Sequence, residues 1–584
     1  MVIKYIINLN IKFSQKLKLI IYAYYQYNNI QNYYIMDGVQ IDNTNTEEVS
    51  KNKEVAIVVT GSVDSGKSSF IGVMTSGQLD DGNGSARLSV AKHPHEKRTG
   101  KTSDISTRSL HLDNGQVVTL IDLCGHEKYL KTTTFGITGY FPDYAIVVVA
   151  ANRGLLKMTK EHLGILLYMK IPIVIVITRV DIAPAEIYDG TVKLIKKTMQ
   201  ACKKKVEFVN SLKEFSLSPT ELKEKELQSI KKVQELADFL QTNDSLIPVI
   251  SISNKTGYYV DVIKTLIKSF KPRKLWNSQT TSSIFYIDST FAPPGIGTVV
   301  SGKLKGKSLK VGDIIYIGPQ GKNFVAVKIR SMHNNVRESI RELHDSQRGC
   351  ISISVIDKKN DLTRENIKKG MIAVHPEVLT KNVAYRFISR IEILNHSTTI
   401  ANNYCPVINA GCISQTSRLL GYEVVDKDNV DNEKDIVDRL LKKINTPKSL
   451  LDEEEAKIEK KVDSVPNPNN TNATDKDVNP LVLDENADPI DENSKQINKK
   501  DKKDRKGLKT KDIAIAAFKF KFRPEFIEKD MTFFFREGCT RGVGQILDIL
   551  PIAEDIDANP DQATRRRRGH YYRRKNKKNL PTVI

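Results

Sequence analysis

The 584-residue sequence predicts a multidomain protein, an α/β domain followed by two all-β domains. Three observations lead to this fold class. Buried apolar strands alternate with helices from Glu54 onward, and a glycine-rich loop follows the first of these strands. Beyond Ser282 the pattern changes to short strands separated by glycine turns. At about 100–200 residues per domain, the length allows about three to five domains.

The α/β domain is predicted from its apolar runs. Strands that alternate with helices favour a parallel sheet covered by helices on both faces. Asp113-Asn114-Gly115 separates two strand-like runs and is a strong hairpin signal. A Lys-rich helical stretch from Glu186 to Asn243 is longer than a simple crossover requires. The expected strands are 54–60, 144–151, 171–178 and 247–251, and the expected helices begin near Lys67 or span 160–170 and 260–270.

The rest of the chain divides by composition. Residues 271–282 are predicted to be a linker, and residues 298–318 give the clearest run of short strands after it. A second all-β unit begins near Val383, and its strands resume at residues 513–522. The insertion between about 424 and 511 is rich in Asn, Asp, Glu and Lys, with few aromatic residues, so we expect it to be disordered.

The charge of the chain indicates an anionic partner. The formal net charge is +21, which favours nucleic acid, a ribonucleoprotein or a membrane surface. The tail from Arg565 holds six Arg and three Lys without an acid, next to Tyr571 and Tyr572. Cations beside rings that can stack favour contact with RNA or the ribosome, and a localisation signal or a solubilising tail are the alternatives.

Other classes of protein are disfavoured. No apolar run approaches the ~18 residues that a membrane-spanning helix needs, so we expect no membrane-spanning protein, and among anionic partners we expect RNA and not a membrane. Six scattered Cys without a CxxC pair argue against a disulfide framework or a zinc ribbon and fit a reducing compartment. Residues 1–50 are expected to be a leader that is either disordered or, upstream of Met36, not translated.

The strongest motif is a phosphate-binding loop at residues 61–68. The sequence fits GxxxxGK[ST], follows a buried strand and opens a helix. Its backbone N–H groups can point at phosphate, Lys67 can reach the β- and γ-phosphates, and Ser68 can ligate Mg²⁺. The expected nucleotide contacts are Gly61, Ser62, Val63, Asp64, Ser65, Gly66, Lys67, Ser68 and Ser69.

A second motif, Asp122-Leu123-Cys124-Gly125-His126, ends the next buried strand. Asp122 is placed to hold Mg²⁺ through water, and the Gly125 N–H is placed to sense the γ-phosphate. His126 is the candidate for orienting the attacking water. The predicted catalytic residues are therefore His126, Lys67 and Gly125.

Two further loops would select the base. Thr178-Arg179-Val180-Asp181 ends a buried strand, and the Asp181 carboxylate can accept hydrogen bonds from the N1–H and N2–H₂ of guanine. Adenine lacks these donors, so Asp181 separates a GTPase from an ATPase. Backbone N–H groups of the loop with Ser253, Asn254 and Lys255 would bind guanine O6.

The segment between the phosphate-loop helix and the hairpin should supply one more metal ligand. A hydroxyl must complete the Mg²⁺ shell, and we assign it to Thr102, with Thr99 and Ser103 as rivals. The predicted metal ligands are thus Ser68, Thr102 and Asp122. His93 and His95 in the same segment are interpreted as surface histidines, not as a metal site.

With these motifs in hand, the chain resembles the translational GTPases of the elongation factor Tu and elongation factor 1-alpha class. It is most similar to the eukaryotic GTP-binding protein 1 and 2 family. The stretches that carry the resemblance are TGSVDSGKSSFIGVMTSGQLDDGNGSAR, DLCGHEKYLKTTTFGITGYFPDYAIVVVAANRG, MTKEHLGILL, FAPPGIGTVVSG and FFFREGCTRGVGQI.

The resemblance implies a GTP-binding domain followed by two β-barrels. It also implies binding of GTP, GDP and Mg²⁺, hydrolysis of GTP, and work with the ribosome and tRNA or other RNA, as a cytoplasmic monomer. The domains are expected at 51–272, 282–380 and 381–562, with a basic tail at 563–584.

The chain departs from the elongation factors at three motifs. Asn-Lys-x-Asp becomes Thr178-Arg179-Val180-Asp181, Cys124 occupies a variable position of the second motif, and Arg-Gly-Ile-Thr becomes Gly100-Lys101-Thr102-Ser103.

Three alternatives to an elongation-type function stay open. A ribosome-rescue, termination or RNA-surveillance GTPase would use the same motifs with another cargo. A GTP-regulated metabolic subunit of the sulfate-activating type shares the scaffold. A pseudo-GTPase scaffold would have lost the chemistry, against the intact motif residues.

Overall fold

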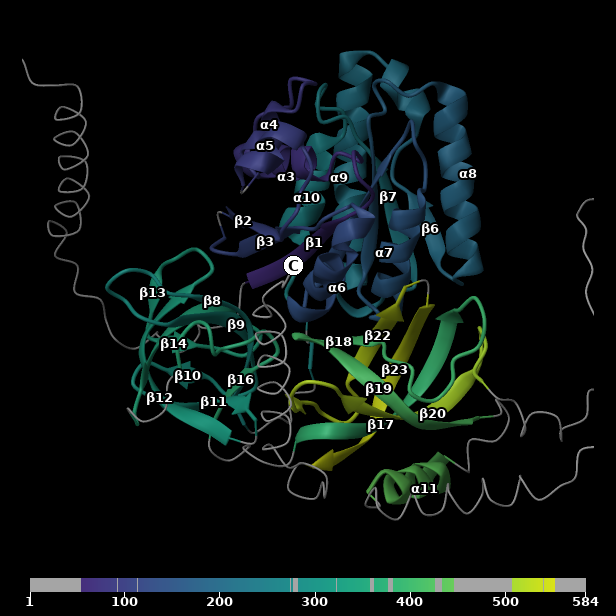
Figure 1. Cartoon of the computed structure of the whole chain (residues 1–584). Coiled ribbons are helices and arrows are strands. Elements are labelled where there is room, and N and C mark those ends of the chain that lie inside the picture. The colour runs from purple at the N-terminus through teal and green to yellow at the C-terminus, as the bar shows by residue number, and fades with distance from the viewer. Residues whose placement is uncertain are drawn as a thin grey trace, which may run out of the picture. The chain divides into compact units, whose positions relative to one another are not determined.

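The computed structural model describes residues 54–273, 275–276, 282–375, 382–425, 433–445 and 507–551, apart from positions 92, 113, 322 and 539 and the stretch 358–361. The predictions for the leader, for most of the insertion and for the basic tail lie outside the described residues. Three β-sheet structures follow one another along the described chain (Figure 1).

A mixed sheet forms the centre of the first domain. The strand order is β2-β3-β1-β4-β5-β7-β6, and all neighbours are parallel except the hairpin pair of β2 and β3. Strands β4 and β5 are buried along their whole length, as their unbroken apolar sequences predict. The strands are β1 (Glu54–Thr60), β2 (Ser106–His111), β3 (Val117–Asp122), β4 (Tyr144–Ala150), β5 (Ile173–Thr178), β6 (Lys205–Phe208) and β7 (Leu246–Ser251).

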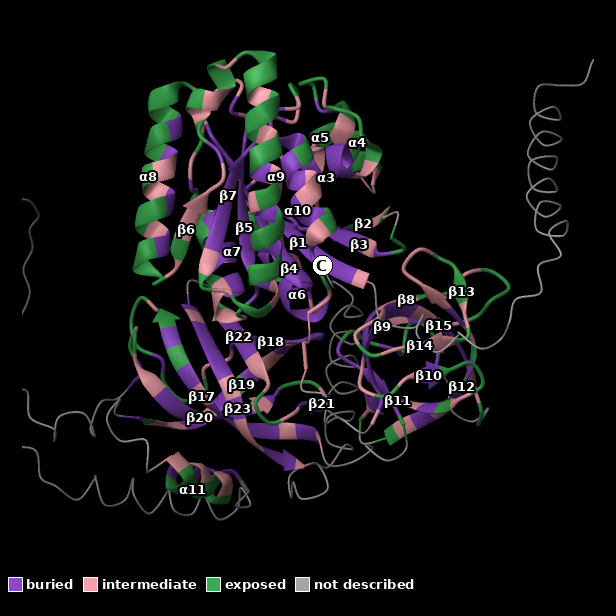
Figure 2. Cartoon of the chain, turned by 180° about the vertical axis from the view of Figure 1, so that it is seen from behind, coloured by how far each residue is buried: buried purple, intermediate pink, exposed green. Residues whose placement is uncertain are grey.

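Helices cover both faces of this sheet. Helices α6 and α7 lie in front of it in Figure 1, whereas α9 and α10 come to the front in the reverse view of Figure 2. The helices are α3 (Lys67–Ser76), α4 (Ser85–Leu88), α5 (Pro94–Thr99), α6 (Leu130–Gly139), α7 (Lys157–Tyr168), α8 (Ala185–Ala201), α9 (Pro219–Thr242) and α10 (Val260–Ser269), with the 3₁₀ turns η1 (Glu127–Tyr129) and η2 (Leu212–Ser216). Within the described residues no helix has the length and apolar character to cross a membrane.

The Lys-rich stretch from Glu186 to Asn243 holds more than helices. It contains α8, the edge strand β6, the turn η2 and then α9. The prediction of one helical stretch missed β6 because this strand has only four residues, is only partly buried and pairs on one side alone, with β7. Helix α9 begins at a capping box in which Ser218 and Glu221 bond reciprocally, so its start is marked in the sequence.

The second sheet closes into an antiparallel barrel of six strands. The order β11-β16-β8-β9-β15-β12 is closed by pairing of β11 with β12. Its core is aliphatic, with Ile315, Val327 and Ile351 fully buried. The strands are β8 (Ile284–Phe291), β9 (Val299–Lys305), β11 (Ile314–Gln320), β12 (Asn323–Asn334), β15 (Arg348–Val355) and β16 (Ile372–Val374), with the short additions β10 (Leu309–Lys310), β13 (Ser339–Ile340) and β14 (Glu342–Leu343).

The third sheet is also a closed six-strand barrel, which confirms the predicted fold class. Its order β20-β19-β18-β22-β23-β17 is closed by pairing of β20 with β17. Five phenylalanine rings fill the core: Phe387, Phe518, Phe520, Phe533 and Phe535. The strands are β17 (Val383–Asn395), β18 (Val407–Ala410), β19 (Ile413–Val424), β20 (Ile513–Phe520), β22 (Thr532–Glu537) and β23 (Thr540–Pro551), with the short β21 (Glu525–Phe526).

One expectation for the insertion is wrong. Residues 433–445, expected to be disordered, form helix α11 (Glu433–Asn445), which packs on the second barrel (Figure 1). Its buried face consists of Ile436, Leu440 and Ile444 at helical spacing. Arg390 of β17 forms an ion pair with Glu433 at 2.7 Å. The helix escaped prediction because its three buried residues stand among charged ones in a segment of mostly polar composition.

Candidate functional site

The phosphate-loop motif lies between β1 and α3 and uses glycine where only glycine fits. Gly66 caps α3 with φ of +88°, in the left-handed region. Gly61 has φ of +145°, and a Cβ atom there would collide with the carbonyl oxygen of Val148. The backbone N–H groups at the start of α3 and the helix dipole together favour an anion at this loop.

Lys67 is buried and turns back onto the loop. Its Nζ donates a hydrogen bond to the carbonyl oxygen of Ser62 at 2.7 Å. Burial lowers the pKa of this amine, and the charge of Asp122 opposes that shift. The loop with Gly125 lies directly beside it, because a Cβ on Gly125 would be 2.6 Å from the Lys67 Nζ. A bound phosphate could replace the Ser62 carbonyl as the hydrogen-bond acceptor of the Lys67 ammonium.

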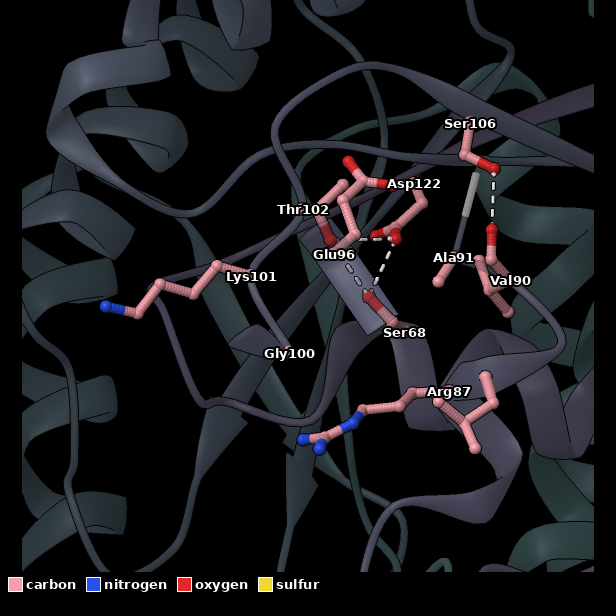
Figure 3. Close-up of a pocket in the computed structure, with 11 residues that line it drawn as sticks. Ser68, Arg87, Val90, Ala91, Glu96, Gly100, Lys101, Thr102, Ser106 and Asp122 are labelled. Atoms are coloured by element: carbon pink, nitrogen blue, oxygen red, sulfur yellow. Dashed lines mark hydrogen bonds between the residues drawn. The ribbon is translucent and has the colours of Figure 1, made fainter. Parts of the chain in front are cut away.

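Three oxygen-bearing side chains converge at the start of α3 (Figure 3). The Ser68 hydroxyl donates to the Asp122 carboxylate at 2.7 Å and lies 3.1 Å from the Thr102 hydroxyl, which is 3.3 Å from the same carboxylate. Asp122 is buried, its Oδ1 has no hydrogen-bond partner, and burial raises its pKa. Hydroxyl and carboxylate oxygens are the ligands that Mg²⁺ takes in proteins, so the cluster fits that cation.

The segment before β2 explains why Thr102 and not a neighbour reaches this cluster. The buried Glu96 carboxylate accepts bonds from the backbone N–H and the hydroxyl of Ser103, at 2.7 and 2.8 Å. The Thr99 hydroxyl donates to the carbonyl of His95. Both rivals of Thr102 are therefore occupied elsewhere. His93 and His95 stack on each other, and the described residues contain no group of three or more His, Cys, Asp or Glu side chains that could hold a metal ion.

His126 does not face the oxygen cluster in this structure. Its side chain is exposed, and its Nδ1 accepts the backbone N–H of Lys128 at 3.1 Å, capping η1. It does not line the cavity formed by Ser68, Thr102 and Asp122. The structure thus brings together the predicted metal ligands, Lys67 and Gly125, but not the predicted water-orienting residue.

The two predicted base-binding loops follow neighbouring strands, β5 and β7. Thr178 donates its hydroxyl to the carbonyl of Ser65 at 2.7 Å and so ties this edge to the phosphate loop. Arg179 adopts φ of +61°, which turns the chain ahead of Asp181. The Ser253 hydroxyl accepts N–H bonds from Lys255 and Thr256. Asn254 has a buried Oδ1 without a hydrogen-bond partner, next to Gly66.

Sequence reasoning missed a supporting contact behind the phosphate loop. His162 of α7 is fully buried and its Nδ1 lies 2.8 Å from the Thr60 hydroxyl, at the end of β1. Thr159, one turn earlier, accepts the Ser62 N–H at 3.2 Å. Burial, aided by the charge of Lys67, lowers the pKa of His162 to about 3. The spacing of Thr159 and His162 on one helix face was the available signal.

Comparison with known proteins agrees with this geometry. Residues 52–273 match the family model described as the elongation factor Tu GTP binding domain. Residues 52–273 are thus similar to a GTP-binding domain of the elongation factor Tu type. This confirms the resemblance drawn from the motifs, and the described site lies entirely inside the matched range.

Relatives of the whole chain are GTP-binding proteins. The chain is 33% identical over 394 residues to GTP-binding protein 1 of Xenopus laevis, covering 63% of this chain and 56% of that protein. It is 27% identical over 540 residues to GTP-binding protein 2 of Mus musculus, covering 88% and 71%. The matched part thus spans little more than half the length of the Xenopus relative.

The fold of the elongation-factor-type domain and the two barrels has a solved counterpart. Translation elongation factor SelB from Methanococcus maripaludis, in complex with the GTP analogue GppNHp, superposes with a TM-score of 0.51 at 18% identity. The likeness covers 86% of this chain and 80% of that one. It shows that the two chains share the fold of a G domain followed by two six-strand barrels.

Proposed function

We propose that the protein is a GTP-hydrolysing translation factor of the elongation-factor type. The observation that carries the proposal is the convergence of Ser68, Thr102 and Asp122 beside the phosphate loop, inside a domain of the elongation factor Tu family. The same oxygens fit Mg²⁺, and the loop fits the phosphates of GTP or GDP.

Each residue of the site has a distinct task in this proposal. Ser68, Thr102 and Asp122 would hold Mg²⁺. Mg²⁺, when bound, neutralises charge on the β- and γ-phosphates. Lys67 leaves the Ser62 carbonyl for phosphate, and the Gly125 N–H donates to the γ-phosphate. Asp181 accepts the two guanine donors, flanked by the loop of Ser253, Asn254 and Lys255.

His126 would orient the attacking water after a rearrangement. Because His126 is exposed, caps η1 and does not line the cavity beside the phosphate loop, we expect slow hydrolysis in the described state. An activator that turns His126 inward would accelerate the reaction. We propose that the ribosome, with tRNA or another RNA, supplies this activation, because the related proteins of known name include translation elongation factors.

The proposal also predicts the location, the oligomeric state and the partners of the protein. A factor that meets ribosomes and RNA is expected in the cytoplasm as a monomer, and its excess of positive charge suits such partners. Ribosome rescue, termination and RNA surveillance stay as alternatives of the same class. Co-sedimentation with ribosomes, with and without charged tRNA, separates them from an elongation-type function, because only that function makes ribosome binding depend on charged tRNA.

The nucleotide assignment is tested by Asp181→Asn. An Asn amide donates to the C2 carbonyl of xanthine but cannot accept both guanine donors, so preference should move from GTP to XTP by about 100-fold or more. Titration of fluorescent GTP and XTP into the purified chain measures this, with Glu186→Gln on the exposed start of α8 as matched control. An unchanged preference, or competition by ATP as strong as by GTP, would overturn the proposal.

A further inference from the structure

Arg87 lies at the wall of the cation cluster and has no part in the site described so far. It belongs to α4, in the segment between α3 and α5. Its half-buried side chain lines one small cavity together with Ser68, Thr102 and Asp122 (Figure 3). In that view the guanidinium extends below Gly100, on the side of the cavity away from Asp122.

Two glycines hold a slot open for this guanidinium. A Cβ on Gly84 would lie 2.8 Å from the Arg87 Nε, and a Cβ on Gly100 would lie 2.7 Å from its Nη1. Both glycines also have positive φ, of +91° and +67°. A side chain at either position would be strained and would push the guanidinium aside. The guanidinium therefore lies directly against the backbone of both glycines.

The positive charge in this slot has no described anion to balance it. No hydrogen bond or ion pair joins the guanidinium to any residue in the described ranges, and its Nε is buried without a partner. The nearest acids in the sequence are engaged elsewhere. Asp81 accepts backbone N–H groups of Asn83 and Ser85, and Asp80 accepts that of Ala86.

Leaving the buried Nε of Arg87 without a partner costs free energy, and its two terminal nitrogens, which are not among the buried atoms without a partner, are available to an incoming anion. The anion expected at the adjoining loop is the triphosphate of GTP, and guanidinium matches phosphate oxygens with two parallel N–H bonds. We propose that Arg87 binds the γ-phosphate and stabilises charge there during hydrolysis, as an arginine supplied by the chain itself. This inference rests on the proposed GTPase function.

The reaction it would assist is a simple displacement. The water oxygen forms a bond to the γ-phosphorus as the bond from that phosphorus to the β,γ-bridging oxygen breaks. The electron pair of the broken bond stays on the bridging oxygen, which leaves with GDP. The protons of the water pass to the released phosphate and solvent. Arg87 bonds the γ-oxygens, where negative charge is spread in the transition state.

The test compares a GTP analogue with GDP. Arg87→Ala in the full-length chain should weaken binding of GTPγS about tenfold or more, leave GDP binding within about twofold, and slow single-turnover hydrolysis at saturating GTP. Arg87→Lys should recover part of the loss, because lysine keeps the charge without the fork. Arg98→Ala, an exposed arginine on α5, serves as the matched control.

Each outcome has one meaning. Equal weakening of the affinities for GTPγS and GDP would show that Arg87 only supports the fold of the loop. No change in either affinity would show that Arg87 does not contribute to nucleotide binding. Either result overturns the inference. Unchanged GDP affinity in Arg87→Ala also shows that the variant is folded. Failure of the unaltered chain to bind guanine nucleotides would instead overturn the proposed function itself.

Discussion

Some residues of the site could be predicted from sequence motifs, whereas others were found only from the geometry of the structure. Lys67, Ser68 and Asp122 follow from sequence patterns whose spacing fixes their chemistry. Cys124, a departure from the elongation factors, is completely buried, and burial raises the pKa of its thiol to about 12. It is therefore a small neutral core residue at neutral pH, which explains why the motif accepts it.

His162 gives the G domain a pH-dependent stability. Its folded pKa of about 3 lies below the ~6.5 of an unfolded histidine, so the unfolded chain binds more protons between these values. The free energy of unfolding must then fall as pH falls, by about 2 kcal/mol from this residue between pH 7.5 and 5. Urea unfolding at the two pH values measures the change.

The variant His162→Asn isolates this contribution, because an amide can bond Thr60 and does not titrate. Over the same pH interval, the free energy of unfolding of this variant should fall by about 2 kcal/mol less than that of the unaltered chain. His111→Asn, an exposed histidine on β2, should behave like the unaltered chain. Equal pH dependence in the chain and in His162→Asn would refute the assignment of His162 as a buried neutral histidine.

At the scale of secondary-structure elements, the sequence predicted the elements that have long, clear patterns of apolar residues. Strands β1, β4 and β5 were predicted within two residues because uninterrupted apolar runs bounded by turns leave little choice. Short elements at an edge, such as β6, carry too few apolar positions to stand out. Helix α11 packs its apolar face on the barrel, where Ile436, Leu440 and Ile444 are buried and Val437 and Leu441 are partly buried.

The candidate site, too, could be predicted only in part from the sequence. The grouping of Ser68 with Asp122 could be foreseen because both follow neighbouring strands of a parallel sheet. The choice of Thr102 among three hydroxyls required the structure, in which Glu96 holds Ser103. The outward position of His126 could not be predicted, because it depends on a local cap and not on spacing. The roles of these residues stay predictions.

Helix α11 should stabilise the second barrel. Leu440 is 3% exposed and packs with Ile388 and Ile515 of the barrel strands. Leu440→Ala removes that contact and leaves a cavity, so we expect a loss of about 2–3 kcal/mol in the free energy of unfolding. Lys443→Ala, at an exposed position of the same helix, should change it by less than about 0.5 kcal/mol. Chemical denaturation followed by tyrosine fluorescence measures both.

A cost for Leu440→Ala as small as that for Lys443→Ala would contradict the packing of α11 on the barrel. That result would support the prediction from composition that the whole insertion is disordered. The expected result would instead mark residues 433–445 as a structural part of the barrel.

At the scale of the whole molecule, a candidate nucleotide site lies in a G domain that two β-barrels follow. The G domain carries the chemistry, and the two barrels give the arrangement that it shares with SelB. The net charge of +21 suits a ribonucleoprotein partner. Because His126 points outward, we propose that activation by such a partner is the step on which hydrolysis depends.

The most direct test is the rate of GTP hydrolysis with and without ribosomes, for the unaltered chain and for His126→Ala. We predict slow intrinsic hydrolysis, stimulation by ribosomes, and a loss of that stimulation by about 100-fold or more in His126→Ala with GTP affinity unchanged. Hydrolysis that ribosomes leave unchanged in the unaltered chain, or that they stimulate equally in His126→Ala, would contradict this prediction.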